Sequence, residues 1–93
     1  SISNDIASGC TVLEVISPDR TGLLATIGQV FMDHNIQLQN AKISTLGERI
    51  EDIFFITDTN GSPLGNAQQC DELQTAICSS LDQHVEKDLA AWQ

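Results

Sequence analysis

Residues 17–28, SPDRTGLLATIG, place an acid, a base, a hydroxyl and a glycine directly before an apolar helical pattern. A helix that begins here presents unsatisfied backbone N–H groups and a partial positive charge at its N-terminus. A carboxylate can dock on such N–H groups without a basic side chain, and Gly22 has no Cβ to block a close approach. The segment is therefore either a binding loop for a small acid or only a tight turn with a helix cap.

The composition argues against several classes of function. The chain has a formal net charge of −9, from 13 acidic and 4 basic residues, which makes nucleic acids and anionic membranes poor partners. It has no apolar run near the roughly 18–20 residues that span a bilayer. Its 3 cysteines lack the spacing of a metal site or a disulfide framework. We therefore expect reduced thiols in a cytoplasmic protein, with no metal and no cofactor.

The length predicts one small domain over residues 1–93. Because the chain begins at Ser1 and not at a methionine, we expect a piece of a larger protein.

Hydrophobic periodicity predicts the order strand, helix, strand, strand, helix. The expected elements are a strand at 10–17, a helix from about 21–22 to Asn35, strands at 36–46 and 50–57, and a helix at about 67–84. The strand at 10–17 is apolar on both faces, which favours a central strand covered on both sides. The alternation in 36–46 changes phase, so we expect a bulge near Gln39 and Asn40.

This order is a ferredoxin-like α+β fold without its last strand. Its antiparallel sheet would carry two helices on one face. We expect residues 1–5 to pair antiparallel with 10–16 and so to take the place of the missing fourth strand, because an uncovered flank of a central strand is normally avoided. The alternative edge strand is the tail at 85–93, although its composition is too charged and too rich in alanine.

Residues 13–61 resemble ACT domains, which are small ligand-sensing modules of enzymes in amino-acid metabolism. The resemblance rests on DRTGLL at 19–24, NI at 35–36, AKI at 41–43 and DIFFITD at 52–58, taken together. The segment AKISTLGERIEDIFFITD is similar to the C-terminal ACT repeat of bacterial uridylyltransferase/uridylyl-removing enzymes. The resemblance implies a regulatory, non-catalytic domain that senses an amino acid, with glutamine expected, and that controls uridylylation and deuridylylation of the PII signal protein.

In this family the ligand lies between the loop after the first strand and the second strand of a neighbouring domain. The resemblance thus implies pairing with another ACT domain, in a homodimer or a neighbouring repeat. The ligand-binding residues it implies are Asp19, Arg20, Thr21, Gly22, Leu23, Leu24 and Gln37. Asp19 would bind the α-ammonium group and Gln37 an amide or the ligand backbone. Thr21 stands where the family commonly has proline.

Three rival functions remain open at this stage. Acylphosphatases share this architecture, but their phosphate loop has an arginine inside the helix, where residues 23–34 have no base. A nucleic-acid module would need exposed aromatic and basic residues on its sheet. An ACT dimerisation module without a ligand is the most serious alternative. One of Phe54 and Phe55 must face away from the helices, which suggests a partner surface.

The loop also makes a prediction about Gly22. If its φ is helical, an alanine there should cost the fold less than about 1 kcal/mol.

Overall fold

The computed structural model describes residues 2–5, 7–18, 22–47 and 49–90. Along the chain, the elements are β1 (Ile2–Asp5), β2 (Cys10–Pro18), α1 (Leu23–Asp33), β3 (Gln37–Leu46), β4 (Arg49–Thr57) and α2 (Ala67–Ala90). The four strands form one antiparallel sheet in the order β1-β2-β4-β3. This is the predicted α+β architecture.

The N-terminal strand occupies the edge that the missing fourth strand would hold, as predicted. β1 pairs antiparallel with the first half of β2, with Ile2 opposite Leu13 and Asp5 opposite Cys10. The connection turns back at Asp5, whose carbonyl accepts a hydrogen bond from the Gly9 N–H at 3.1 Å. The alternative, in which the tail forms this edge, is wrong because residues up to Ala90 are helical.

Two local irregularities were also predicted from the sequence. The register of β3 against β4 shifts between Leu38 and Asn40, which is the expected bulge. Asn35 follows α1 with a left-handed φ of 56°, a conformation that asparagine tolerates better than most residues. It therefore ends α1 and turns the chain into β3.

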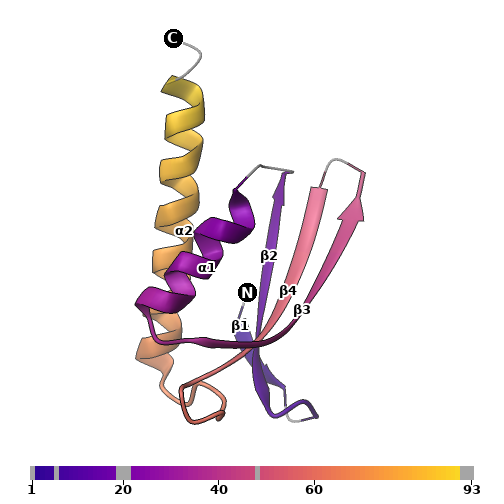
Figure 1. Ribbon diagram of the computed structural model, residues 1–93, viewed down its shortest axis with the longest axis vertical. Coiled ribbons are helices and arrows are strands. Elements are labelled where there is room, and N and C mark those ends of the chain that lie inside the picture. The colour runs from indigo at the N-terminus through magenta and orange to yellow at the C-terminus, as the bar shows by residue number, and fades with distance from the viewer. Residues whose placement is uncertain (1, 6, 19–21, 48, 91–93) are drawn as a thin grey trace.

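Both helices lie on the same face of the sheet, with α1 packed beside α2 (Figure 1). Each helix buries one apolar stripe there. α1 contributes Leu23, Ile27, Val30 and Phe31, and α2 contributes Leu73 and Ile77 with Cys70 and Leu81 packed beside them. The rings of Phe31 and Phe54 meet edge to face, with their centroids 5.5 Å apart, and so tie α1 to β4.

The opposite face of the sheet has no helix over it among the described residues. The prediction that β2 is covered on both sides is therefore wrong. Leu13 and Val15 are buried under the helices, whereas Ile16, on the other face, is 56% exposed. Phe55 also lies on this face, and the ammonium of Lys42 sits 5.6 Å from its ring centroid. Two helices cover only one side of the sheet. The apolar residues on the other face of β2 are therefore less buried than their pattern predicted.

The second helix continues six residues beyond its predicted end at His84. Residues 85–90, VEKDLA, contain strong helix formers and neither glycine nor proline, so nothing in them ends the helix.

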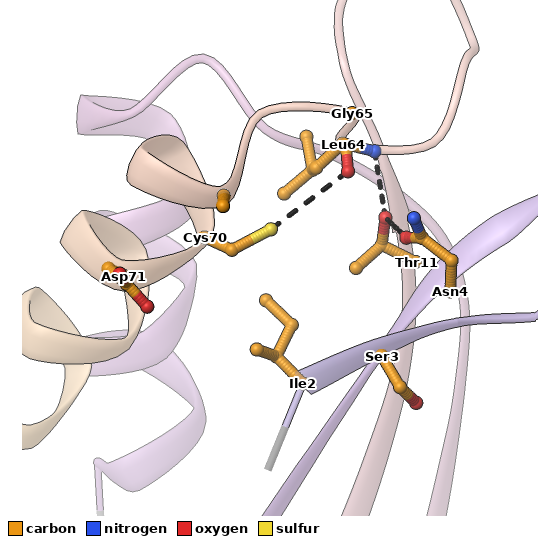
Figure 2. A pocket seen from close by; sticks show the side chains of 9 residues that line it. Ile2, Ser3, Asn4, Thr11, Leu64, Gly65, Cys70 and Asp71 are labelled. Atoms are coloured by element: carbon orange, nitrogen blue, oxygen red, sulfur yellow. Dashed lines mark hydrogen bonds between the residues drawn. The ribbon is translucent and has the colours of Figure 1, made fainter.

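A buried threonine joins β1, β2 and the loop before α2 (Figure 2). The hydroxyl of Thr11 donates to Asn4 Oδ1 at 2.7 Å and accepts from the backbone N–H of Leu64 at 2.8 Å. Thr11 itself is 0% exposed. A buried polar group that loses its hydrogen-bond partner lowers the stability of the fold. This hydroxyl therefore helps to hold β1 against the rest of the fold.

Substitution of Thr11 by valine tests this link. Thr11→Val keeps the shape but leaves the Leu64 N–H unpaired, so we expect a loss of about 1–3 kcal/mol in the free energy of unfolding, measured in urea. The control is Thr45→Val, which changes an exposed hydroxyl on β3. Equal stabilities for the two variants would show that the Thr11 hydroxyl does not hold β1.

Candidate functional site

The connection from β2 to α1 was the predicted binding loop. Three of its residues, Asp19, Arg20 and Thr21, lie outside the described residues. Gly22 is the N-cap residue of α1, and its carbonyl accepts the Thr26 N–H at 3.0 Å. No side chain of the described residues caps this end of the helix, and its first turn has no acidic residue. Among the described residues, no side chain therefore satisfies its first backbone N–H groups, and a helix start of this kind suits an acceptor from outside the helix.

The remaining predicted site residues do not come together within one chain. Leu23 is buried in the core, whereas Leu24 is 49% exposed. Gln37 lies at the other end of the sheet, where it pairs with Thr57 and donates to the Thr59 carbonyl at 3.4 Å. The 11 residues of α1, about 16 Å of helix, separate Gln37 from Gly22. A ligand held by both residues would have to bridge two copies or two domains.

The backbone of Gly22 differs from the expectation. Its φ is +85°, in the left-handed region, although an added Cβ would meet nothing within 4 Å. The premise that alanine fits here with a helical φ is wrong. Glycine is required at this position by the turn itself, which must reverse from β2 into α1.

The structure reveals a second group of polar atoms that the sequence analysis missed. Asp52, on β4, is 1% exposed, and Ser17, on β2, is 8% exposed. Within the described part of the chain, the Ser17 hydroxyl and both carboxylate oxygens of Asp52 have no hydrogen-bond partner. The signal was available in IEDIFFIT, because strand alternation puts Asp52 on the same face as Phe54 and Ile56.

Register places this pair near the start of α1. Asp52 is opposite Val15, and Ser17 is opposite Ile50, so the two polar side chains are diagonal neighbours on the helix-covered face. Ser17 is one residue before the end of β2, the end from which the chain passes into α1 (Figure 1). The Asp52 and Ser17 oxygens, which lack partners within the described ranges, therefore lie at the same end of the sheet as the start of α1.

Asp52 lies next to β3, a part of the helix-facing side of the sheet that the helices do not cover. Ile43, on β3, is directly opposite Asp52, yet it is 55% exposed. Leu38 is opposite the fully buried Ile56 and is itself 50% exposed. The helices therefore cover β2 and β4 but leave β3 largely bare, and Asp52 lies at the border.

Burial raises the pKa of the Asp52 carboxyl above its ordinary value. The physical cause is desolvation, since removal from water penalises the charged form. Within the described residues, the buried Asp52 carboxylate lacks the hydrogen bonds that buried polar groups normally have. A cationic group that donates N–H hydrogen bonds would supply them.

Other chemistry finds little support in the described residues. They contain no group of three or more His, Cys, Asp or Glu side chains that could hold a metal ion. No helix in the described ranges is long and apolar enough to cross a membrane. All 3 cysteines are free thiols. Cys70 lines a pocket of about 320 Å³ between β1 and α2 (Figure 2), but burial and the neighbouring Asp71 raise its thiol pKa, which disfavours a nucleophilic thiolate.

Comparison with known proteins identifies the family. The sequence profile described as "ACR family N-terminal ACT domain" matches residues 6–84. The chain belongs to the ACT domain family. This confirms the resemblance to ACT domains, whereas the likeness to a C-terminal repeat stays a prediction.

Curated relatives narrow the position within the ACT family. The chain is 54% identical over 86 residues to a bifunctional uridylyltransferase/uridylyl-removing enzyme of Pseudomonas syringae pv. tomato. The corresponding enzymes of Stutzerimonas stutzeri and Azotobacter vinelandii are 52% and 53% identical over 87 and 81 residues. These alignments cover 87–94% of the chain but only 9–10% of each enzyme.

A solved structure agrees with the ACT fold. The crystal structure of an unknown protein from Galdieria sulphuraria superposes with a TM-score of 0.61 at 17% identity, covering 75% of this chain and 37% of that one. At this identity the likeness concerns the fold alone.

The left-handed φ of Gly22 leads to a prediction with a matched control. Gly22→Ala should lower the free energy of unfolding by about 1–2 kcal/mol, because a Cβ is unfavourable in this region. Gly28→Ala lies inside α1, where an added methyl meets nothing within 4 Å, and should raise stability by about 0.5–1 kcal/mol. Urea unfolding measures both. Equal effects of the two substitutions would contradict the backbone explanation.

The unpartnered carboxylate leads to a second prediction. Asp52→Asn removes a buried charge at nearly constant shape, so we expect a gain of roughly 1 kcal/mol, or about 4–8 °C in Tm.

The gain should depend on pH. Because the folded-state pKa is raised, the wild-type fold loses stability as pH rises from 3.8, the ordinary value, through the folded value. The advantage of the Asn variant should therefore grow as pH rises above 3.8. A variant less stable than the wild type at neutral pH would show that the carboxylate already has a stabilising partner.

Proposed function

We propose that this chain is the amino-acid-sensing ACT domain of a cytoplasmic uridylyltransferase/uridylyl-removing enzyme. The observation that carries the proposal is the identity of about 54% to such enzymes across 92% of the chain. The domain would perform no catalysis of its own. It would report the level of an amino acid, with glutamine as the first candidate, and so control uridylylation and deuridylylation of the PII signal protein.

The binding step would use the N-terminus of α1. The α-carboxylate of the amino acid would accept hydrogen bonds from the N–H groups of the first turn, beside Gly22, with help from the helix dipole. Leu24 is exposed next to this position. In the family mode, Asp19, Arg20 and Thr21 would complete the loop, and Gln37 of a neighbouring domain would contact the ligand from the other side.

Pairing with another ACT domain is part of this proposal. Large apolar side chains stand exposed on several elements: Ile16, Leu24, Met32, Leu38 and Ile43. Because Gly22 and Gln37 lie at opposite ends of α1 within one chain, a second domain would bring the two halves of the site together.

A dimerisation module without a ligand is the second candidate function. Two of these exposed residues support it, since Leu38 and Ile43 lie on the part of β3 that the helices leave uncovered and that a partner could bury. The two candidates differ in whether an amino acid binds.

Titration calorimetry of the chain with each of the twenty amino acids tests the proposal. We expect one amino acid, glutamine first, to bind, and binding to raise Tm because a ligand of the folded state stabilises it. Absence of binding by all twenty at millimolar concentration, together with a dimer in sedimentation velocity, would replace the proposal with the dimerisation module.

A further inference from the structure

We propose that Asp52 and Ser17 form the subsite for the ammonium group of the bound amino acid. The inference rests on the proposed function and adds to it a group outside the loop on which the resemblance depends. The proposal assigns the binding of the ammonium group to Asp52 on β4 and Ser17 on β2. The sequence analysis had expected Asp19 to bind it.

Donor and acceptor numbers match in this arrangement. Ser17 Oγ, Asp52 Oδ1 and Asp52 Oδ2 are three buried oxygens that lack partners within the described residues. An ammonium group carries three N–H donors on one small centre. Its positive charge would also remove the desolvation penalty of the carboxylate, because hydrogen bonds between ionised groups are stronger than those between neutral ones. A metal ion fits less well, since the described residues supply no cluster of three ligating side chains here.

Position supports an amino acid in preference to a simple amine. The first turn of α1 has no side-chain cap from the described residues and is suited to a carboxylate, and Asp52 with Ser17 lies on the helix-covered face at the same end of the sheet. An α-amino acid carries its carboxylate and ammonium on one carbon, so it needs an anion site and a cation site close together. The N-terminus of α1 alone would bind any small carboxylic acid. The Asp52 carboxylate beside it would favour a zwitterion, which carries an ammonium group as well.

The side of β3 is where a ligand would approach this pair. Ile43 is directly opposite Asp52 on the same face and is 55% exposed, so the helices do not cover that side. Asp52 itself is 1% exposed, so binding requires the side chains at this border to shift and admit the ammonium group.

The energetic cost of this carboxylate fits a binding site. A buried carboxylate without a partner destabilises the folded state, and a nonpolar or neutral residue at position 52 would remove that cost. Proteins retain such costs at sites where function requires an unsatisfied group.

A comparison of two ligands and three proteins tests the subsite. The ligands are L-glutamine and glutaramate, which is glutamine without its amino group. The proteins are the wild-type chain and Asp52→Asn, with Asp33→Asn as a control, since Asp33 is exposed and accepts a hydrogen bond from Gln29 at 3.0 Å. If the calorimetric screen selects another amino acid, that amino acid and its deaminated analogue replace this pair of ligands.

We expect the wild type and Asp33→Asn to bind L-glutamine at least about tenfold more tightly than glutaramate. Asp52→Asn should lose this preference, so that its two affinities agree within about twofold, although the variant melts at a higher temperature than the wild type. A merely structural role for Asp52 would not remove the discrimination between the ligands while raising Tm.

Several outcomes would overturn the assignment. One is an undiminished preference for L-glutamine in Asp52→Asn, which would leave amino-acid sensing intact and return the ammonium to another residue such as Asp19. A second is a change in the sedimentation coefficient of Asp52→Asn without ligand, which would place the carboxylate in a contact between copies. Absence of binding by any amino acid to the wild type would overturn both the subsite and the proposed function.

Discussion

Two helices must cover a four-stranded sheet in this domain, and they cover only part of one face. Everything under α1 and α2 is buried, including Leu13 on β2 and Ile56 on β4. Outside their reach the apolar residues remain exposed, as at Ile16 on the open face and Ile43 on β3. Since burial of apolar area is the main stabilising term in a domain this small, these uncovered surfaces are surplus apolar area that a partner domain could bury.

The edge of the covered region is where the candidate site lies. Asp52 is opposite the buried Val15 on one side and the exposed Ile43 on the other. A carboxylate on the surface would be solvated, and its attraction to a ligand would be weak. Asp52 is 1% exposed but lies next to the uncovered strand β3, so an ion pair formed there would be desolvated and would contribute strongly to ligand selection.

Much of the fold could be predicted because local patterns determine it. The phase change in β3 predicted the bulge, Asn35 predicted the end of α1, and the absence of a fourth strand predicted the role of residues 2–5. Each of these features depends on residues that are close in sequence or on a sheet edge that must be filled.

The errors arose where burial depends on distant elements. The apolar faces of β2 do not reveal that only one of them receives helices, and the helical pattern does not reveal that Gly22 reverses the chain with a positive φ. For the site, the motif indicated the loop, whereas Asp52 became a candidate only when its unpartnered oxygens were seen in the folded chain. Gln37 was placed in the site by resemblance, and one chain alone leaves it at the far end of α1.

The state of the Asp52 carboxyl can be observed directly by NMR. Its 13Cγ chemical shift, followed across pH with and without the amino acid that binds, reports the pKa of this one group. Without ligand, we predict a pKa above the ordinary 3.8, and with saturating ligand a decrease, because a bound ammonium favours the charged form. A pKa at or below 3.8 in the free chain would contradict the account, since it would mean that the carboxylate is already paired.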